Sequence, residues 1–266
     1  MAPQPRVLSA PVTVGGFQRL AETVADHMRA QILDGTLTDG SLLPKEDELR
    51  GLFPVSKPTF REAMRILESE GLVTVRRGNV GGAVVHRPTA RHVAYTLGMV
   101  LASTGVTIDQ VAAALREIEP ACAAMCAQRR DRKREVVPEL RRLHQRYLDS
   151  IDHLVEVVGW SRTFHESLVS LCGNAPLIVT AGALESMWSA HEKGWASRIA
   201  EDDPVHMSER LAAAAVHEKI IELIAKGDAE GVRHVAAEHL SHAQRNPTPA
   251  HGAIRIDPAL VRNHVG

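Results

Sequence analysis

Aromatic residues are scarce in this sequence. Its 266 residues include only four Phe, three Trp and two Tyr, which is 3% of the chain. Because strand-rich folds favour aromatic and β-branched side chains, this scarcity favours a mainly helical fold. The hydrophobic share of 44% is enough for one large core or two modest ones.

Net charge is also nearly absent. The 31 Lys and Arg residues face 32 Asp and Glu residues, so the formal net charge is −1. This balance excludes a polycationic protein that coats nucleic acid, and it excludes an acidic disordered protein.

Cysteines and long apolar runs are few. The three cysteines, Cys122, Cys126 and Cys172, are odd in number and do not form a disulfide framework. No apolar run is long enough to span a membrane. Residues 1–15 carry one Arg and no continuous apolar core, which excludes a secretory signal. We therefore expect a cytoplasmic protein with no membrane partner.

Composition divides the chain into four parts. Residues 1–16 are expected to form a flexible arm, 17–88 a first compact block, 89–245 a second block and 246–266 a loose tail. The tail is expected because the prolines at 247 and 249 break the last helical pattern.

The first block has the order of a winged helix-turn-helix domain. Apolar residues spaced by four predict a helix over 19–33, and further helices are expected over 45–52 and from Ser56, a plausible N-cap, to Glu70. Gly71 ends the third helix. Strands are then expected over 72–75 and 83–85, around a glycine-bearing hairpin. A third helix followed by a two-stranded wing is the arrangement used to bind DNA.

The third helix carries a basic stripe. Lys57, Arg61 and Arg65 are spaced by four and therefore share one face. A basic stripe alone is usually just a solvated face. The short preceding helix and the wing residues Arg76 to Gly78 favour a DNA-binding role for this stripe, because cationic side chains bind phosphates and base edges. Residues 1–88 carry 11 Lys and Arg against 10 Asp and Glu. A positive potential toward DNA must therefore come from where the basic residues lie, not from an excess of them.

The second block is helical throughout. Its apolar residues recur in steps of three and four, which is typical of the core faces of an all-α helical bundle. Breaks expected at Gly105, Asp131, Gly159, Gly173 and Gly227 give six or seven helices.

Ten of the 14 histidines lie in the second block. Periodicity places His165, His217 and His239 on the inward faces of three different helices. A single inward His is more often a satisfied core residue, but three on converging helices favour a site. Neutral imidazole is the commonest transition-metal ligand. His144 and His191 also lie on apolar stripes, so the set of candidates is not exclusive.

Specific segments resemble a known family. The first block resembles the GntR family of bacterial regulators over residues 32–37, 40–49, 55–63 and 67–73. The second resembles the FCD effector domain of the FadR subfamily, at residues 116–119, 164–165, 173–177, 217–220 and 227–228. The resemblance implies a homodimer that places each third helix in the major groove of one half-site of a pseudo-palindromic operator. It also implies that the second block binds a small metabolite, usually an organic acid.

The resemblance also implies site residues. The DNA contacts it implies are Lys45, Ser56, Lys57, Thr59, Arg61 and Arg65, with Arg77 and Gly78 in the wing. The effector residues it implies are Arg116, His165, His217 and His239. Arg116 either pairs with an effector carboxylate or forms an ordinary ion pair with Glu119.

Many FCD domains bind a divalent metal through an Asp, a His four residues later and two further His. The three histidines match His165, His217 and His239, but Ser161 stands at the Asp position. Two alternatives follow. Either the three histidines hold Zn²⁺ or Ni²⁺ and an effector carboxylate fills the open positions, or no metal binds and the imidazoles contact an anionic effector directly.

These patterns and the resemblance indicate a ligand-responsive transcriptional regulator and not an enzyme. A repressor is expected, although the sequence itself does not give the sign of regulation. The main alternative is a metal-dependent hydrolase with Glu166 or Glu218 as general base. Each of these glutamates directly follows a histidine, however, so it points away from that histidine's face. A DNA-binding architectural protein without effector is disfavoured, because inward polar groups are costly without a purpose.

Overall fold

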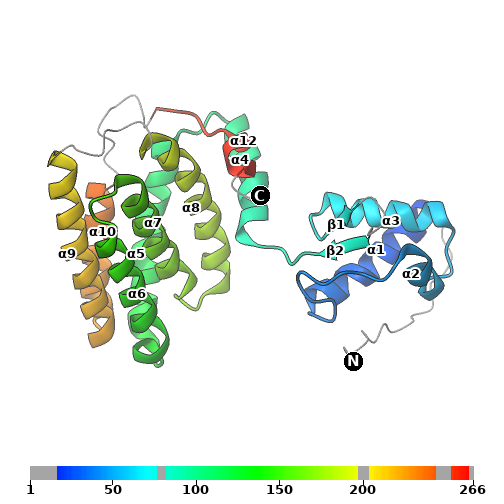
Figure 1. Ribbon diagram of the computed structural model, residues 1–266, viewed down its shortest axis with the longest axis horizontal. Coiled ribbons are helices and arrows are strands. Elements are labelled where there is room, and N and C mark those ends of the chain that lie inside the picture. Colours follow the sequence, from blue (N-terminus) through cyan, green and yellow to red (C-terminus); the bar gives the residue numbers. More distant parts are fainter. Residues whose placement is uncertain (1–16, 77–81, 197–203, 244–252, 264–266) are drawn as a thin grey trace. The chain divides into compact units, whose positions relative to one another are not determined.

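The computed structural model describes residues 17–76, 82–196, 204–243 and 253–263. The chain divides into two compact units, residues 1–88 and 89–266. Each unit is described by itself below, with the element labels of Figure 1.

The first unit contains the predicted winged helix-turn-helix. Its elements are α1 (Phe17–Leu33), α2 (Glu46–Leu52), α3 (Lys57–Ser69), β1 (Val73–Arg76) and β2 (Gly82–Val85). The two strands pair antiparallel, with Val73 opposite Val85 and Arg76 opposite Gly82. Three helices followed by a two-stranded wing confirm the fold expected for this block.

Local sequence sets the bounds of α3. The Ser56 hydroxyl accepts a hydrogen bond from the Thr59 backbone N–H at 3.3 Å, which satisfies one of the free donors of the first turn. Pro58 lies within that first turn, where its missing N–H costs nothing. After the helix, Gly71 adopts a φ of 72°, a conformation that side chains resist, and the chain turns into β1.

One apolar core holds the first unit together. Phe60 and Leu67 from α3 are buried with Val24, Met28 and Ile32 from α1. Burying these faces leaves the opposite side of α3 to its charged residues, so hydrophobic packing decides which side of the helix meets solvent.

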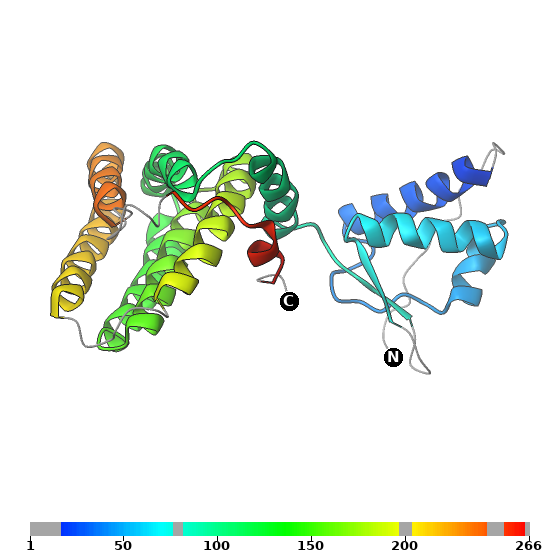
Figure 2. The ribbon, with the colours of Figure 1, turned by 90° about the horizontal axis from the view of Figure 1, so that it is seen from above.

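The second unit is an all-α bundle, as predicted (Figures 1 and 2). Its described helices are α4 (Ala90–Ser103), α5 (Ile108–Gln128), α6 (Arg132–Asp149), α7 (Leu154–Ser170), α8 (Ala175–Ala196), α9 (Pro204–Lys226), α10 (Ala229–Ala243) and α12 (Pro258–Asn263). None of the helices in the described ranges is long and apolar enough to cross a membrane.

Helix α5 lies at the centre of this bundle. It packs against α6, α7, α8, α9 and α10. Its buried residues include Leu115, Cys122 and Cys126, and the last two belong to the largest apolar cluster together with Phe164 and Ile220. Helices α9 and α10 lie side by side and are joined at Gly227, whose φ is 81°. A side chain that projects from α5 therefore meets residues from several helices at once.

One expected helix break is wrong. Gly159 lies inside α7, and the interruption comes earlier, between α6 and Leu154. Glycine costs about 1 kcal/mol in a helix interior, and burial of Val157 and Phe164 on the same helix outweighs that cost. Ser150 is the C-cap of α6, and its hydroxyl donates to Glu156 Oε2, in the first turn of α7, at 3.0 Å.

The expectation of a loose tail over 246–266 also needs correction. Within it, Ile256 is only 4% exposed and belongs to an apolar cluster with Ile108 and Trp188. Its backbone N–H donates to the Val106 carbonyl at 3.1 Å, and α12 packs against α4 and α8. An apolar residue of the expected tail therefore docks on the bundle.

Candidate functional site

The basic stripe predicted on α3 is exposed. Lys57, Arg61 and Arg65 face solvent, and acidic neighbours hold all three. Glu46, in the first turn of α2, lies 3.1 Å from Arg61 Nε and 3.9 Å from Lys57 Nζ, while Glu62 lies 2.9 Å from Arg65. Exposed ion pairs of this kind contribute roughly 0–1 kcal/mol, so phosphates can replace the carboxylates at little cost.

A hollow of about 610 Å³ lies beside this stripe. The start of α2, α3 and both strands line it, with charged side chains from Lys45, Glu46, Arg61, Arg65, Glu68 and Arg76. The structure thus gathers four cations and two carboxylates around one hollow, and the four cations lie in the helices and wing that were predicted from the sequence to bind DNA.

Two residues of the predicted DNA set have local structural roles. Ser56 is the N-cap of α3, and its hydroxyl bonds the Thr59 hydroxyl at 2.7 Å. Thr59 is only 2% exposed, so its side chain is turned into the helix start instead of outward. We therefore leave Thr59 out of the proposed contacts. Arg77 and Gly78, the predicted wing residues, lie outside the described residues.

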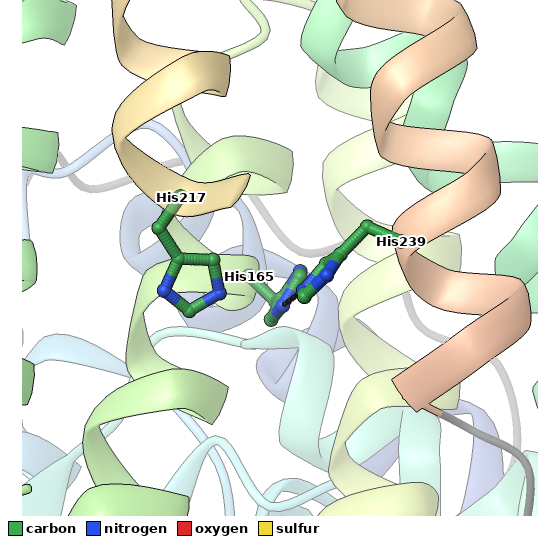
Figure 3. A group of neighbouring side chains, drawn as sticks. All are labelled: His165, His217 and His239. Carbon is green, nitrogen blue, oxygen red and sulfur yellow. Dashed lines mark hydrogen bonds between the residues drawn. The ribbon is translucent and has the colours of Figure 1, made fainter. Parts of the chain in front are cut away.

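The three predicted histidines meet inside the bundle. His165 comes from α7, His217 from α9 and His239 from α10, and one ring nitrogen of each lies within 4.8 Å of the others. Figure 3 shows the rings of His165 and His239 lying nearly parallel, with His217 beside them. The ring centroids of His165 and His239 are 5.2 Å apart at an interplanar angle of 10°, and the Nε2 atoms of these two residues are 3.3 Å apart.

His217 is the most buried of the three. It is 0% exposed, and neither ring nitrogen has a hydrogen-bond partner among the described residues. The Phe164 ring stacks on it at 4.3 Å, with Tyr147 edge-on at 5.1 Å. An imidazole with two unsatisfied nitrogens in a dry core is costly unless something binds them.

Burial holds two of the three histidines, His217 and His239, in their neutral form. Burial lowers the pKa of His217 well below its ordinary value, and the neighbouring His165 lowers it further. Burial likewise lowers the pKa of His239 to about 3, again with a contribution from His165. Neutral imidazoles offer lone pairs, which is the form that binds metal ions.

These residues fit a divalent metal. Two nitrogens that each lie about 2.0–2.1 Å from one tetrahedral zinc ion are separated by roughly 3.3 Å, and this matches the 3.3 Å between the Nε2 atoms of His165 and His239. One of the two unpartnered ring nitrogens of His217 provides the third ligand atom. Three nitrogen ligands with an open position suit Zn²⁺ or Ni²⁺.

Ser161 and Arg116 lie on helices that also carry residues in or beside the cluster. Ser161 is half-buried on α7, one turn before His165. Arg116 is half-buried on α5, three residues before Glu119, and therefore near it on the helix surface.

Glu119 is a residue of this site that sequence reasoning missed. It is 1% exposed, and its Oε1 bonds the Nδ1 of His165. The available signal was its position one turn after Leu115 and three residues before Cys122, which are both buried on the stripe of α5. A glutamate at such a position is unusual, because glutamate is almost never fully buried unless paired.

The other two inward histidines do not join the cluster. His191 is satisfied locally, since its Nδ1 donates to the Met187 carbonyl at 2.8 Å and its Nε2 accepts from the Asp257 backbone N–H at 3.4 Å. His144 lies 3.5 Å from Glu218 and packs edge-on to His217 at 6.2 Å.

Comparison with known proteins agrees with these two units. The model of the gntR family of bacterial regulatory proteins matches residues 20–84, and the model of the FCD domain matches residues 110–242. The HTH-type transcriptional regulator Mce2R of Mycobacterium tuberculosis is 27% identical over 231 residues, which cover 84% of this chain and 89% of that protein.

One further relative and one solved structure are also similar to this chain. The HTH-type transcriptional repressor NanR of Klebsiella aerogenes is 37% identical over 73 residues, 27% of each chain. A solved GntR structure from Streptococcus agalactiae, 19% identical, superposes with a TM-score of 0.62 over 85% of this chain and 100% of that one, and so shows the fold. The chain therefore belongs to the gntR family of bacterial regulatory proteins, carries an FCD domain, and is a DNA-binding transcriptional regulator, not an enzyme.

Proposed function

We propose that this regulator binds a pseudo-palindromic operator as a homodimer, and that a small carboxylate at a metal ion in the His165, His217 and His239 cluster changes its affinity for that operator. The observation that carries the proposal is His217, a fully buried imidazole with both nitrogens unpartnered, facing two further imidazoles. A purely structural histidine would have found hydrogen-bond partners, as His191 does.

At the DNA, Lys57, Arg61 and Arg65 are the proposed contacts from α3, with Lys45 at the start of α2 and Ser56 at the helix N-terminus. The exposed guanidinium groups pair bidentately with guanine edges or phosphates. Glu46 and Glu62 hold the arginines until DNA replaces them. Arg77 and Gly78 are proposed for the wing on resemblance alone.

At the effector site, the three imidazoles hold the ion and Arg116 binds a carboxylate. The metal, when bound, supplies a positive charge and open coordination positions for carboxylate oxygens. Arg116 orients the anion, because a guanidinium matches a carboxylate with two parallel hydrogen bonds. Since α5 packs against α7, α9 and α10, a ligand held there biases the packing of several helices together.

Repression is proposed on one observation. A stretch of 73 residues of this chain is 37% identical to NanR, which is named a transcriptional repressor. On this account the free protein occupies its operator, and the carboxylate lowers its affinity for DNA. A ligand can shift this equilibrium only by as much as its affinities for the two states differ.

The hydrolase alternative finds no support. The family and its relatives are regulators. The two glutamates named as general base are engaged elsewhere, since Glu166 pairs with Arg162 at 3.5 Å and Glu218 lies 3.5 Å from His144.

Untagged protein tests the proposal. The operator is enriched from a random-sequence duplex library, and the metal content is measured by mass spectrometry in wild type and in His217→Gln. A panel of mono-, di- and tricarboxylates is then screened by thermal shift, because a ligand that binds the folded state stabilises it. We expect about one metal ion per chain in wild type only. Equal and negligible metal in both proteins would sink the metal centre, while failure to enrich any duplex would sink the DNA assignment.

A further inference from the structure

Glu119 is a carboxylate inside the apolar core. It lies on α5 at 1% exposure, between Leu115 and Cys122, which are both fully buried. Placing a carboxylate in such surroundings costs several kcal/mol unless a positive or hydrogen-bonding group compensates. Helix α5 packs against α7, α9 and α10, the three helices that carry the histidines. The carboxylate is therefore placed to act on the cluster from its own helix.

Only half of this carboxylate is satisfied. Oε1 bonds the Nδ1 of His165, whereas Oε2 is buried with no hydrogen-bond partner among the described residues. Together with the two nitrogens of His217, this makes three buried polar atoms without a hydrogen-bond partner, on two residues that each contact His165. Native proteins rarely keep such groups unless an ion or ligand completes them.

The bond between Glu119 and His165 decides which nitrogen can bind a metal. When Nδ1 carries the proton and donates a hydrogen bond to the carboxylate, the free lone pair is on Nε2. This Nε2 atom faces the other histidines, since it lies 3.3 Å from the Nε2 atom of His239. A carboxylate bonded to the outer nitrogen of a metal-binding histidine fixes its tautomer and raises its basicity as a ligand.

Charge gives a second, independent reason. Three neutral imidazoles leave a divalent cation with its full positive charge inside the bundle, and Ser161 on α7 is a neutral hydroxyl. An uncompensated buried charge is strongly unfavourable. Among the described residues near the histidines, Glu119 is the carboxylate in direct contact with one of them.

We propose that Glu119 is the anion of this metal centre, and that it acts through His165 by positioning the ring and balancing the cation's charge, in place of an aspartate at position 161. This inference rests on the proposed metal centre. Glu119 is a positioning residue here, since its bond is to a ligand nitrogen rather than to the ion.

The test measures Zn²⁺ affinity by competition with a chromophoric chelator at pH 7.5, using the full chain freed of metal by dialysis. Glu119→Gln keeps the size and an acceptor oxygen but removes the charge. We expect it to bind Zn²⁺ about 10–100-fold more weakly than wild type. Adding Ser161→Asp to Glu119→Gln supplies a carboxylate from α7, and we expect this double variant to recover most of the lost affinity.

Glu185→Gln is the matched control. Glu185 is 3% exposed on α8, so this variant also loses a buried carboxylate, but its neighbours Ala183 and Met187 belong to a separate apolar cluster. We expect wild-type Zn²⁺ affinity for it. If Glu119→Gln binds Zn²⁺ as tightly as wild type, the proposal for Glu119 is wrong while the metal centre stands. If wild type and His217→Gln both bind none, the metal centre itself fails.

A second measurement avoids the risk that Glu119→Gln does not fold. Nitrogen NMR of Zn²⁺-loaded wild type, assigned with a His165→Gln variant, reports which nitrogen of His165 binds the ion. We expect a protonated Nδ1 and a metal-bound Nε2. A metal-bound Nδ1 would contradict the proposal, because that atom could not then donate to Glu119.

Discussion

The Nε2 atoms of His165 and His239 lie 3.3 Å apart, although 74 residues separate the two histidines in the chain. Helices α7 and α10 present these atoms, and Glu119 on α5 bonds the far side of the His165 ring. This relationship joins the centre of the bundle to its outer helices. A ligand that binds these atoms would therefore contact α7 and α10 at the same time.

The metal-free protein should lose stability as the pH falls. His239 has a pKa of about 3 in the folded protein, and that of His217 is also lowered, against about 6.5 for unfolded histidine. The unfolded chain therefore binds more protons between about pH 6.5 and about pH 3. The contribution of these neutral imidazoles to the free energy of unfolding is complete above about pH 6.5. It falls progressively as the pH drops through that window.

Urea unfolding in the presence of EDTA, at pH values from 7.5 to 4.5, measures this effect. All three tryptophans, Trp160, Trp188 and Trp195, lie in the second unit, so their fluorescence reports on that unit. We expect the free energy of unfolding to fall more steeply with decreasing pH in wild type than in His239→Gln. Equal slopes would show that burial of His239 does not oppose its protonation.

Arg61→Ala should weaken DNA binding and flatten its salt dependence. Arg61 is exposed on α3 and held by one carboxylate, so it is available for a phosphate or a guanine. Losing one phosphate contact lowers the slope of log K against log salt by about 1. Fluorescence anisotropy with the enriched duplex at several salt concentrations measures both effects.

The matched control for Arg61→Ala is Arg142→Ala. Arg142 lies on α6 in the second unit, is 55% exposed and pairs with Glu139 at 2.6 Å. It loses the same charge away from the proposed interface, so we expect wild-type affinity and slope. If Arg61→Ala behaves like this control, α3 is not the recognition helix.

Glu46→Gln should strengthen non-specific DNA binding. The Glu46 carboxylate repels phosphates at the surface where Arg61 and Lys57 lie, and its ion pairs there are exposed and weak. Removing that charge should tighten binding to a random-sequence duplex by about two- to fivefold at low salt. Glu230→Gln, at a 90% exposed position on α10, changes the same charge and should have no effect. Weaker binding by Glu46→Gln would mean that the carboxylate orients Arg61 for DNA.

Ile256→Ala should destabilise the second unit by about 2–5 kcal/mol, because it leaves a cavity in a packed cluster. Ile256 is 4% exposed there, beside Trp188. Ile254, at 40% exposure, provides the control, and Ile254→Ala should cost no more than about 0.5 kcal/mol. Tryptophan-monitored urea unfolding compares the two. Equal stabilities would mean that residues 253–263 do not dock as described.

Patterns within single helices could be predicted from the sequence. The inward position of His217 follows from its spacing to Ile220 and Ile224, which are both buried. The exposure of Arg61 follows in the same way from Phe60, its buried neighbour on α3. Helical periodicity determines which face of a helix is apolar, and that face carries most of the candidate site.

Contacts between elements could not be predicted in this way. The bond from Glu119 to His165 depends on how α5 crosses α7, which no local pattern specifies. The burial of Thr59 depends on the hydroxyl of Ser56, and resemblance of sequence alone did not show it. Docking of Ile256 likewise depends on a surface made by residues about 150 positions earlier, around Val106 and Ile108.

The most direct test of the central claim is operator affinity with and without ligand at the histidine cluster. Fluorescence anisotropy is measured on the enriched duplex for wild type and for His217→Gln, both treated with Zn²⁺ in the same way. Each protein is measured with and without the carboxylate that gives the largest thermal shift. We expect that carboxylate to weaken wild-type binding about 5–150-fold, the usual range of allosteric coupling, and to leave His217→Gln unchanged. An equal response of the two proteins, or no response of wild type to any carboxylate in the panel, would contradict the claim that this cluster controls DNA binding.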